Sequence, residues 1–312
     1  MARAVQYSEF GGPEVLAVHE VPDPVPGPGQ VAVRVEAAGV NPIDWKLRSG
    51  LRPSTLDQPR TPGSDGAGFV TVLGEGVEGL RPGTPVAFSG AAGTYATDVL
   101  VAADSVATRP ATVTARQAAG LGVPAATAYQ ALRSLGVGAA DVLLIHGGSG
   151  AVGQAAIQFA RLWGARVLAT TSQARADRVH RLGAEPVVYG PGVADRIRAA
   201  APEGVTVILD AAGTDEAIEA SLELLTDTSR IATVVRGADA AGWGIQAYSG
   251  GSPEPLTARQ QRWRAEALPV ALHLVAVEAF DVEIGAEYPL ERAGEAQQAS
   301  EGGAPGKLLI IP

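Results

Sequence analysis

The N-terminal part of the chain, up to about residue 122, has the hydrophobic pattern of short strands. Val31–Ala37 alternates apolar and polar side chains, as a strand with one buried face does. Turn sequences rich in proline and glycine, such as 22–30 and 81–85, separate this strand from its neighbours. Strand character returns near the C-terminus, at Val282–Ile284 and Lys307–Ile311. Both ends of the chain are therefore predicted to be β-rich.

Between about residues 123 and 270, continuous apolar runs alternate with segments of helical spacing. Such runs are typical of strands buried on both faces of a parallel sheet that helices cover. A chain of 312 residues is long enough for two domains. These patterns divide the chain into the β-rich segments 1–122 and 271–312 and an α/β domain at 123–270. The strands expected in the α/β domain are Val142–Ile145, Arg166–Thr171, Pro186–Tyr189, Val205–Asp210 and Arg230–Val235.

The most informative stretch is Asp141–Gly153, where a buried strand runs directly into a glycine motif and then into a helix at Gln154–Leu162. In a dinucleotide fingerprint the first glycine, here Gly148, makes the turn. Gly150 lets the backbone approach a pyrophosphate, and Gly153 lets the helix pack on the strand. The helix N-terminus adds free N–H groups and the positive end of a dipole. The pattern predicts dinucleotide binding; the alternative is a glycine-rich turn without a ligand.

The end of the second expected strand indicates which dinucleotide binds. Sites that prefer NADH usually place Asp or Glu about 20 residues after the glycines. Here Ser172 ends a Thr-Thr-Ser run and Arg175 follows it. Hydroxyls and a guanidinium suit a 2′-phosphate, so NADPH is favoured. Arg175 could instead lie on the solvated face of a helix at Ala174–Leu182, which is where we expect Arg178.

Composition narrows the class of protein. The sequence has no cysteine, which excludes disulfides, thiolate metal sites and a cysteine nucleophile. Its net charge of −9 argues against a nucleic acid or an anionic membrane as partner. No apolar run reaches the roughly 18 residues of a membrane span, and the N-terminus lacks the apolar core of a signal peptide. The expected location is the cytoplasm.

Several blocks of sequence, in the same order, resemble the zinc-independent quinone oxidoreductases (ζ-crystallin-like) of the medium-chain dehydrogenase/reductase superfamily. The resemblance implies a GroES-like, partly open β-barrel catalytic domain, in which 271–312 rejoins 1–122. It also implies that 123–270 is a Rossmann domain whose parallel sheet is doubly wound. The blocks are 26–44 (PGPGQVAVRVEAAGVNPID), 61–70 (TPGSDGAGFV), 124–132 (PAATAYQAL), 146–153 (HGGSGAVG) and 306–312 (GKLLIIP).

The resemblance also shows which residues of this chain stand at the zinc-ligand positions of zinc-using relatives. Zinc-using relatives carry a Cys after Ala-Ala-Gly-Val and a later Gly-His-Glu. Here the matching residues are Asn41, Ser64 and Asp65. Asparagine and serine are poor zinc ligands beside thiolate and imidazole. No metal site is therefore expected.

Hydride transfer from NADPH needs placement and stabilisation of developing negative charge. We expect Asn41 near the nicotinamide or the substrate carbonyl, although it could simply bond its own turn. Asp44 would orient Asn41 or bond to backbone. Trp45 would be a flat wall for a ring substrate or part of the core. Many relatives carry a Tyr near this point that could donate a proton, so the identity of the acid stays open. Tyr95 matches a family aromatic and is expected to be structural.

The remaining cofactor contacts are those that the resemblance implies. Thr127 would lie near the nicotinamide or its ribose, and Tyr189 beside the 2′-phosphate. Ala211 and Val234 follow strands at the carboxyl edge of the sheet, where ligands bind. Lys307 would reach the phosphates or be exposed on the surface. The full set of expected cofactor residues is Thr127, Gly148, Ser149, Gly150, Ala151, Val152, Gly153, Ser172, Arg175, Tyr189, Ala211, Val234 and Lys307.

Three functions are consistent with these residues: an NADPH-dependent reductase of a small quinone, a reductase of an enone or enoyl substrate in a biosynthetic pathway, and a non-catalytic NADPH-binding protein. A homodimer is expected, because Arg230–Val235 would otherwise be an exposed apolar edge strand. The glycine-rich segment 237–255 reads as a loop that lines the site or a subunit contact.

Overall fold

The structure is a computed structural model that describes residues 1–52, 54–248 and 254–312. The chain forms two compact units. The first unit consists of Met1–Val123 and Leu268–Pro312, and the second of Pro124–Ala267. Both boundaries fall inside helices, α2 (Ala115–Ser134) and α8 (Ala258–Ala276). None of the described helices is long and apolar enough to cross a membrane.

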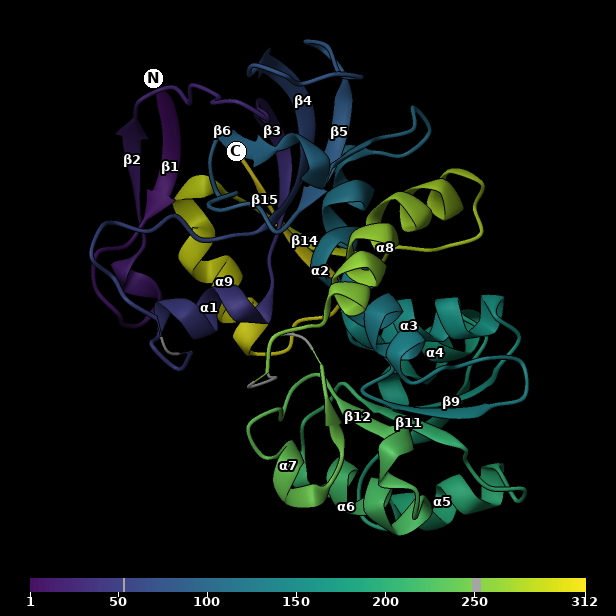
Figure 1. Cartoon of the computed structure of the whole chain (residues 1–312). Helices are drawn as coiled ribbons and strands as arrows, with labels where there is room; N and C mark the ends of the chain where they lie inside the picture. The colour runs from purple at the N-terminus through teal and green to yellow at the C-terminus, as the bar shows by residue number, and fades with distance from the viewer. Residues whose placement is uncertain (53, 249–253) are drawn as a thin grey trace. The chain divides into compact units, whose positions relative to one another are not determined.

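The first unit is built on a seven-stranded sheet of order β14-β15-β3-β4-β5-β7, in which β6 also pairs with β3 (Figure 1). A separate antiparallel pair, β1 with β2, completes its strands. The strands are β1 (Ala2–Gln6), β2 (Ala17–Val21), β3 (Gln30–Gly39), β4 (Asp65–Leu73), β5 (Pro85–Ser89), β6 (Asp98–Ala102), β7 (Val106–Thr108), β14 (Ile284–Pro289) and β15 (Lys307–Ile311). Its short helices are η1 (Pro13–Val15), α1 (Pro42–Arg48), η2 (Ala103–Ser105), η6 (Leu290–Arg292) and α9 (Ala293–Glu301).

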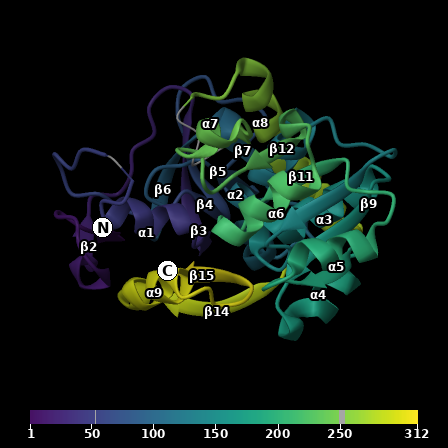
Figure 2. The ribbon, with the colours of Figure 1, turned by 90° about the horizontal axis from the view of Figure 1, so that it is seen from below.

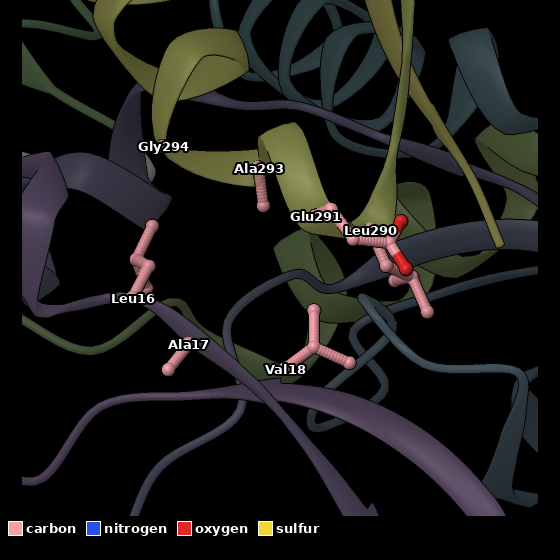
Figure 3. Close-up of a pocket in the computed structure, with 7 residues that line it drawn as sticks. All are labelled: Leu16, Ala17, Val18, Leu290, Glu291, Ala293 and Gly294. Atoms are coloured by element: carbon pink, nitrogen blue, oxygen red, sulfur yellow. The ribbon is translucent and has the colours of Figure 1, made fainter.

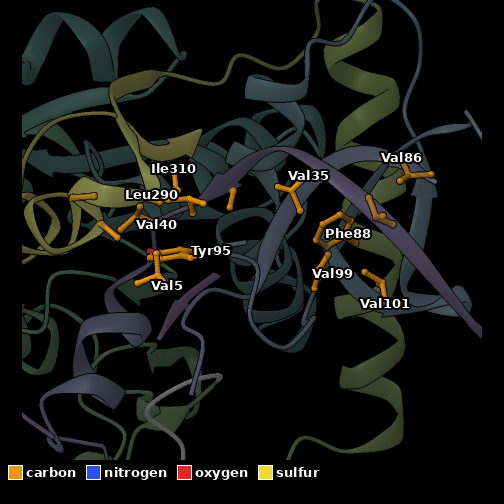
Figure 4. Close-up of a cluster of buried hydrophobic side chains, with 14 of the residues drawn as sticks. Val5, Val35, Val40, Val86, Phe88, Tyr95, Val99, Val101, Leu290 and Ile310 are labelled. Carbon is orange, nitrogen blue, oxygen red and sulfur yellow. The ribbon is translucent and has the colours of Figure 1, made fainter. Parts of the chain in front are cut away.

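The central strand β3 explains how this sheet curves around a core. It pairs with β15, β4 and β6, and its register with β4 shifts twice along its length. Such bulges bend and twist a strand, so one sheet can enclose side chains. The enclosed cluster includes Val86, Phe88 and Ile310, all almost fully buried (Figure 4). These observations confirm the expected GroES-like fold of partly open barrel type.

The second unit is a six-stranded parallel sheet of order β10-β9-β8-β11-β12-β13. Figure 1 shows α3 and α4 on one face and α5 and α6 on the other, as in a doubly wound fold. The strands are β8 (Val142–His146), β9 (Arg166–Thr171), β10 (Glu185–Val188), β11 (Val207–Asp210), β12 (Ile231–Thr233) and β13 (Gln246–Ala247). The helices are α3 (Ala151–Leu162), η3 (Gln173–Arg175), α4 (Ala176–Arg181), α5 (Val193–Ala200), α6 (Asp215–Leu224), η4 (Thr228–Arg230) and α7 (Ala240–Trp243).

Three predictions of local structure were wrong. The strand expected at Val282–Ile284 begins only at Ile284 and continues to Pro289, where it pairs with β15. The segment 237–255 is not simply a loop, because it contains α7 and β13; residues 249–253 of it lie outside the described residues. Since β13 pairs with β12, the last expected strand is not the edge of the described sheet, and β13 is.

Figure 2 shows the same ribbon from below, with α3, α5 and α6 of the second unit beside its strands β9, β11 and β12. Because the strands of this sheet are parallel, their carboxyl ends meet at one edge. The apolar core that supports this edge includes Leu144, Leu168 and Ile208, each with no exposed surface. The turns that follow these strands hold most of the predicted cofactor residues.

Candidate functional site

The glycine turn after β8 is tighter than the motif alone indicates. Gly147, with φ of 78°, adopts the left-handed conformation that makes the turn. We assigned that role to Gly148, which was wrong. A Cβ on Gly148 would lie 2.5 Å from the Cβ of Ala169, so this glycine instead lets the turn pack against β9.

The two later glycines of the motif differ in what their missing Cβ atoms permit. A Cβ on Gly153 would lie 2.2 Å from the carbonyl oxygen of Gly147, so only glycine fits between helix and turn. A Cβ on Gly150 would meet nothing nearer than the same oxygen at 3.5 Å, an ordinary contact. The fold therefore requires glycine at 153 but not at 150. The space at Gly150 is available to a ligand that approaches the backbone.

The backbone of the turn is fixed by β9 and by the first turn of α3. Gly148 N–H donates to the Thr170 carbonyl at 2.8 Å, and Gly147 N–H donates to Thr170 Oγ1 at 3.2 Å. The side-chain amide of Gln154 donates through Nε2 to the Ser149 carbonyl at 2.8 Å. Helix α3 starts at Ala151, with Gly150 as an N-cap whose residue type offers no side chain to bond the first N–H groups. These features fit a pyrophosphate at the N-terminus of α3.

Two buried polar side chains, His146 and Asp210, stand at the ends of the adjacent strands β8 and β11. His146 is buried at the end of β8 beside Thr170 Oγ1 (3.3 Å), and its burial lowers its pKa to about 4. Asp210 ends β11 and accepts from Ala212 N–H at 2.9 Å, Gly213 N–H at 2.8 Å and the Thr233 hydroxyl at 2.7 Å. This carboxylate shapes the turn that carries Ala211.

The residues expected at a 2′-phosphate gather around Thr171, the last residue of β9. Ser172 accepts the Arg175 N–H at 3.0 Å through its carbonyl, and Tyr189 donates its N–H to the Thr171 carbonyl at 3.1 Å. The side chain of Tyr189 is 56% exposed. No acidic side chain stands at the end of β9 or in η3. The arrangement suits an anion better than a pair of ribose hydroxyls.

Arg178 is not on a solvated face, contrary to our expectation. It is half-buried, and its Nε donates to the Gln154 side chain at 2.8 Å. Because Gln154 in turn donates to the Ser149 carbonyl, Arg178 is linked to the glycine turn through α3.

Two other predicted cofactor residues also belong to the second unit. Thr127 is buried on α2, and its hydroxyl accepts from Arg264 at 3.4 Å. Val234 follows β12 and donates its N–H to the Asp210 carbonyl at 3.0 Å. Val234 and Ala211 thus lie at the carboxyl edge of the sheet, as predicted. Contact of these residues with a cofactor stays a prediction.

In the first unit, Asn41 and Asp44 start helix α1. Asn41 is its N-cap, Pro42 its first residue, and Asp44 its third. The Asp44 carboxylate accepts the Asn41 N–H at 2.8 Å, which is one bond of a capping box. The Tyr95 hydroxyl donates to the same carboxylate oxygen at 3.0 Å. Burial is the largest of the influences that raise the pKa of Asp44 to about 7.

The side chain of Asn41 is almost fully buried and is held by three groups of the same unit. Its Nδ2 donates to Asp65 Oδ2 at 2.9 Å and lies 3.4 Å from the Gly39 carbonyl. Its Oδ1 accepts from Lys307 Nζ at 2.5 Å. Lys307 is itself 4% exposed, so the alternative of a surface lysine was wrong. Its contact with phosphates stays a prediction.

Trp45, the next predicted residue of α1, is half-buried. The ammonium of Lys46 lies 5.4 Å from the centre of its ring. Its indole N–H is buried and has no hydrogen-bond partner among the described residues. A buried donor without a partner is uncommon in a packed core. The role of Trp45 as a wall for a ring substrate or as part of the core stays a prediction.

The contact between Asp65 and Asn41 was not predicted, since Asp65 was expected only to stand at a position where zinc-using relatives have a metal ligand. Nothing local in the sequence brings residues 41, 65 and 307 together, since the contacts depend on strand register. Among the described residues, no group of three or more His, Cys, Asp or Glu side chains is arranged to hold a metal ion.

A small pocket of about 210 Å³ in the first unit lies apart from these residues (Figure 3). It is lined mainly by apolar residues of β2, η6 and the start of α9, together with Leu16, which precedes β2. Its one charged residue, Glu291, forms an ion pair with Arg3. It contains none of the predicted site residues.

Comparison with known proteins identifies the family. Residues 27–116 match the alcohol dehydrogenase GroES-like domain, and residues 151–242 match the zinc-binding dehydrogenase family. Quinone oxidoreductase of the mouse (Mus musculus) is 32% identical over 100% of this chain and 98% of its own length. The chain belongs to the quinone oxidoreductase family of the medium-chain dehydrogenase/reductase superfamily.

Solved structures of this family resemble the fold throughout. Escherichia coli quinone oxidoreductase complexed with NADPH has a TM-score of 0.85 and 26% identity, and the match covers 99% of this chain and 100% of that one. A mycobacterial protein complexed with NADPH has a TM-score of 0.84 and 29% identity, with both chains covered completely. The chain is thus an oxidoreductase-family protein whose homologues have been crystallised with NADPH.

Proposed function

We propose that this protein binds NADPH in its second unit and transfers hydride to a small quinone or an activated enone without a metal. The observation that carries the proposal is the glycine turn. It combines space at Gly150, an α3 N-terminus without a side-chain cap, and a strand β9 that is followed by Ser172 rather than by an acid. Membership of the quinone oxidoreductase family supports the acceptor class.

The proposed site uses backbone for the pyrophosphate and side chains for the 2′-phosphate. N–H groups of the turn and of the first residues of α3, Ser149 to Gly153, would bind the pyrophosphate at the positive end of the helix dipole. Arg175, with Ser172 and Tyr189, would bind the 2′-phosphate through charge-assisted hydrogen bonds. Thr127, Ala211 and Val234 would hold the nicotinamide ribose portion at the carboxyl edge of the sheet.

When bound, NADPH supplies a hydride, which adds two electrons to the acceptor. The protein has to position the acceptor and to stabilise the negative charge that develops on its oxygen. Asn41 is the residue that we propose for this task, with Asp44 holding the N-terminus of α1 and Trp45 providing a flat surface. Water completes the reaction by protonating the reduced acceptor, since the proposal assigns no side chain as acid.

The direct test is NADPH consumption by the purified protein against a panel of quinones and enones. We expect turnover with at least one class, and the class that turns over best separates a quinone reductase from an enone or enoyl reductase. Saturable NADPH binding without turnover on any acceptor would contradict the proposal and favour the non-catalytic NADPH-binding function.

We further propose that the protein is a homodimer. The described sheet of the second unit ends at β13, a strand of only two residues. A partner strand added at this edge would satisfy its free backbone groups. Light scattering measures the mass directly, and a monomer of 31.7 kDa at working concentration would contradict the proposal.

A further inference from the structure

Strand register in the first unit brings three distant polar residues to one point. Gly39 at the end of β3 pairs with Leu309 of β15 on one side and with Asp65 of β4 on the other. Asn41 follows β3 by two residues, and Lys307 precedes Leu309 by two in the antiparallel neighbour. The side chains of Asn41, Asp65 and Lys307 therefore meet where β3 ends.

Glycines leave the space that this meeting requires. A Cβ on Gly39 would lie 2.8 Å from Lys307 Cε, and a Cβ on Gly122 would lie 2.3 Å from Asp65 Cγ. Of the 24 basic residues in the chain only two are lysines, Lys46 and Lys307. A compact ammonium fits this space, whereas a planar guanidinium needs more room.

The polar atoms of the cluster have complementary partners. Asp65 accepts from the Ser89 hydroxyl at 2.9 Å, from Val123 N–H at 2.8 Å and from Asn41 Nδ2 at 2.9 Å. Lys307 Nζ donates to Asn41 Oδ1 at 2.5 Å and lies 3.7 Å from Asp65 Oδ2. An anion on one side and a cation on the other allow the Asn41 amide only one orientation. A flipped amide would face its NH₂ toward the ammonium and its oxygen toward the carboxylate.

We propose that Lys307 is a positioning residue that holds the Asn41 amide in the orientation used for reduction of the acceptor. The inference rests on the proposed function, in which Asn41 acts near the developing negative charge. Burial lowers the pKa of Lys307, while Asp65 and Asp44 oppose that shift and favour the charged form. Positioning of this kind affects turnover more than cofactor affinity, because the contacts that we propose for NADPH lie in the second unit, and the positioning role of Lys307 takes the place of the phosphate contact expected from the sequence.

The first test compares Lys307→Met, Asn41→Ala and the double variant in steady-state turnover. We expect Lys307→Met to lower kcat by about 10- to 100-fold, as small misplacements of reacting groups do, and to leave the Kd of NADPH unchanged. The double variant should turn over no more slowly than Asn41→Ala alone, because the lysine acts through the amide. Multiplied losses, or a kcat equal to that of the unaltered protein, would overturn the inference.

A chemical rescue separates the charge of Lys307 from its packing. The sequence has no cysteine, so Lys307→Cys introduces the only thiol. Alkylation of the unfolded variant with 2-bromoethylamine displaces bromide and gives a side chain of lysine length with an ammonium; iodoacetamide gives a neutral side chain. The unaltered protein taken through the same unfolding and refolding is the control. We expect recovered kcat only with the ammonium, and equal kcat for the two alkylated forms would overturn the inference.

The outcomes also separate this inference from the function on which it rests. An unaltered protein that consumes no NADPH with any quinone or enone overturns the proposed function together with the role of Lys307. An active unaltered protein whose Lys307→Met variant is equally active overturns the role of Lys307 alone.

Discussion

The glycine turn of the second unit and the buried cluster of Asn41, Asp65 and Lys307 in the first unit differ in the charge that they carry. The turn has almost no side chains, and it presents backbone N–H groups at the start of α3 without charge of its own. The cluster consists of charged side chains that bond to one another, with Lys307 and Asp65 on either side of Asn41. One region is prepared to receive the charge of a ligand, and the other keeps its own charges in fixed places.

Glycine leaves space in both regions, but for different groups. At the turn, Gly150 leaves space in front of the backbone, where a phosphate can approach. In the cluster, Gly39 and Gly122 leave space for side chains of the protein itself. The missing Cβ atoms thus leave open space at the turn and room for an internal ion pair in the cluster.

The largest effects on NADPH affinity are expected from substitutions in the turn. Gly153 and Gly150 form a matched pair, because only the first is required by the fold. Gly153→Ala places a methyl group against the Gly147 carbonyl, so we expect it to cost about 1–3 kcal/mol of unfolding free energy and to abolish NADPH binding. Gly150→Ala should leave the unfolding free energy nearly unchanged while weakening NADPH at least about tenfold, roughly 1.4 kcal/mol. Unfolding by urea and titration with NADPH measure both. Normal binding by Gly150→Ala would show that the pyrophosphate does not approach there.

The two regions should also oppose each other in the pH dependence of stability. Asp44 has a pKa of about 7 against an ordinary 3.8, so the native state keeps a proton that the unfolded chain loses. Its contribution makes the unfolding free energy fall as pH rises from about 4 to 7. His146 has a pKa of about 4 against 6.5, so here the unfolded chain holds the extra proton. Its contribution makes the unfolding free energy rise with pH between those values.

Single substitutions should reveal each contribution separately. Relative to the unaltered protein, Asp44→Asn should show a stability that increases with pH between about 4 and 6.5, and His146→Asn one that decreases. Each slope is limited to about 1.4 kcal/mol per pH unit, the value for one proton. Urea unfolding across this pH range is the measurement. Identical pH profiles for all three proteins would mean that neither group titrates as its burial implies.

A smaller effect should distinguish phosphate recognition from general cofactor binding. Arg175→Ala should weaken NADPH by about 1–3 kcal/mol, the contribution of a lost charge-assisted hydrogen bond, and leave NADH nearly unchanged. Arg178→Ala is the matched comparison, since Arg178 reaches the turn through Gln154 and should weaken both cofactors alike. Equal losses of NADPH and NADH on Arg175→Ala would place that guanidinium away from the 2′-phosphate.

The smallest expected effect is that of chelation, which tests whether the cluster of the first unit works without a metal. Asn41, Ser64 and Asp65 stand at the positions that match zinc ligands in relatives, and Lys307 bonds to the first of them. Exhaustive dialysis against a chelator should therefore leave turnover unchanged. Zinc content that rises and falls with activity would contradict this expectation.

The sequence predicted the second unit better than the first, for a physical reason. Continuous apolar runs mark buried parallel strands locally, and β8 and β9 lie where Val142–Ile145 and Arg166–Thr171 were expected. The Asn41–Lys307 contact instead joins residues 266 positions apart, and only the register of β15, β3 and β4 decides it. For the same reason β14 was displaced and β13 was not foreseen, because short edge strands carry little pattern of their own.

The features of the candidate site likewise divide into those that local sequence predicts and those that depend on packing. Glycine spacing indicated the turn and the helix that follows it. The residues after the second expected strand showed separately that no acid stands there. Glycine spacing could not show that Gly147 makes the turn, because Gly147 lies outside the spaced motif that begins at Gly148, and only the φ angle of Gly147 reveals its role. Nor could it show that Arg178 is half-buried, since that depends on how α4 packs beside α3.

The central claim is that the second unit binds NADPH, and prefers it to NADH, through the turn and the end of β9. Equilibrium titration of the purified protein with each nucleotide tests this most directly. We predict saturable binding of one NADPH per chain, with NADH bound at least about tenfold more weakly, a difference of roughly 1.4 kcal/mol. Equal affinity for the two nucleotides, or no saturable binding of NADPH, would contradict the account.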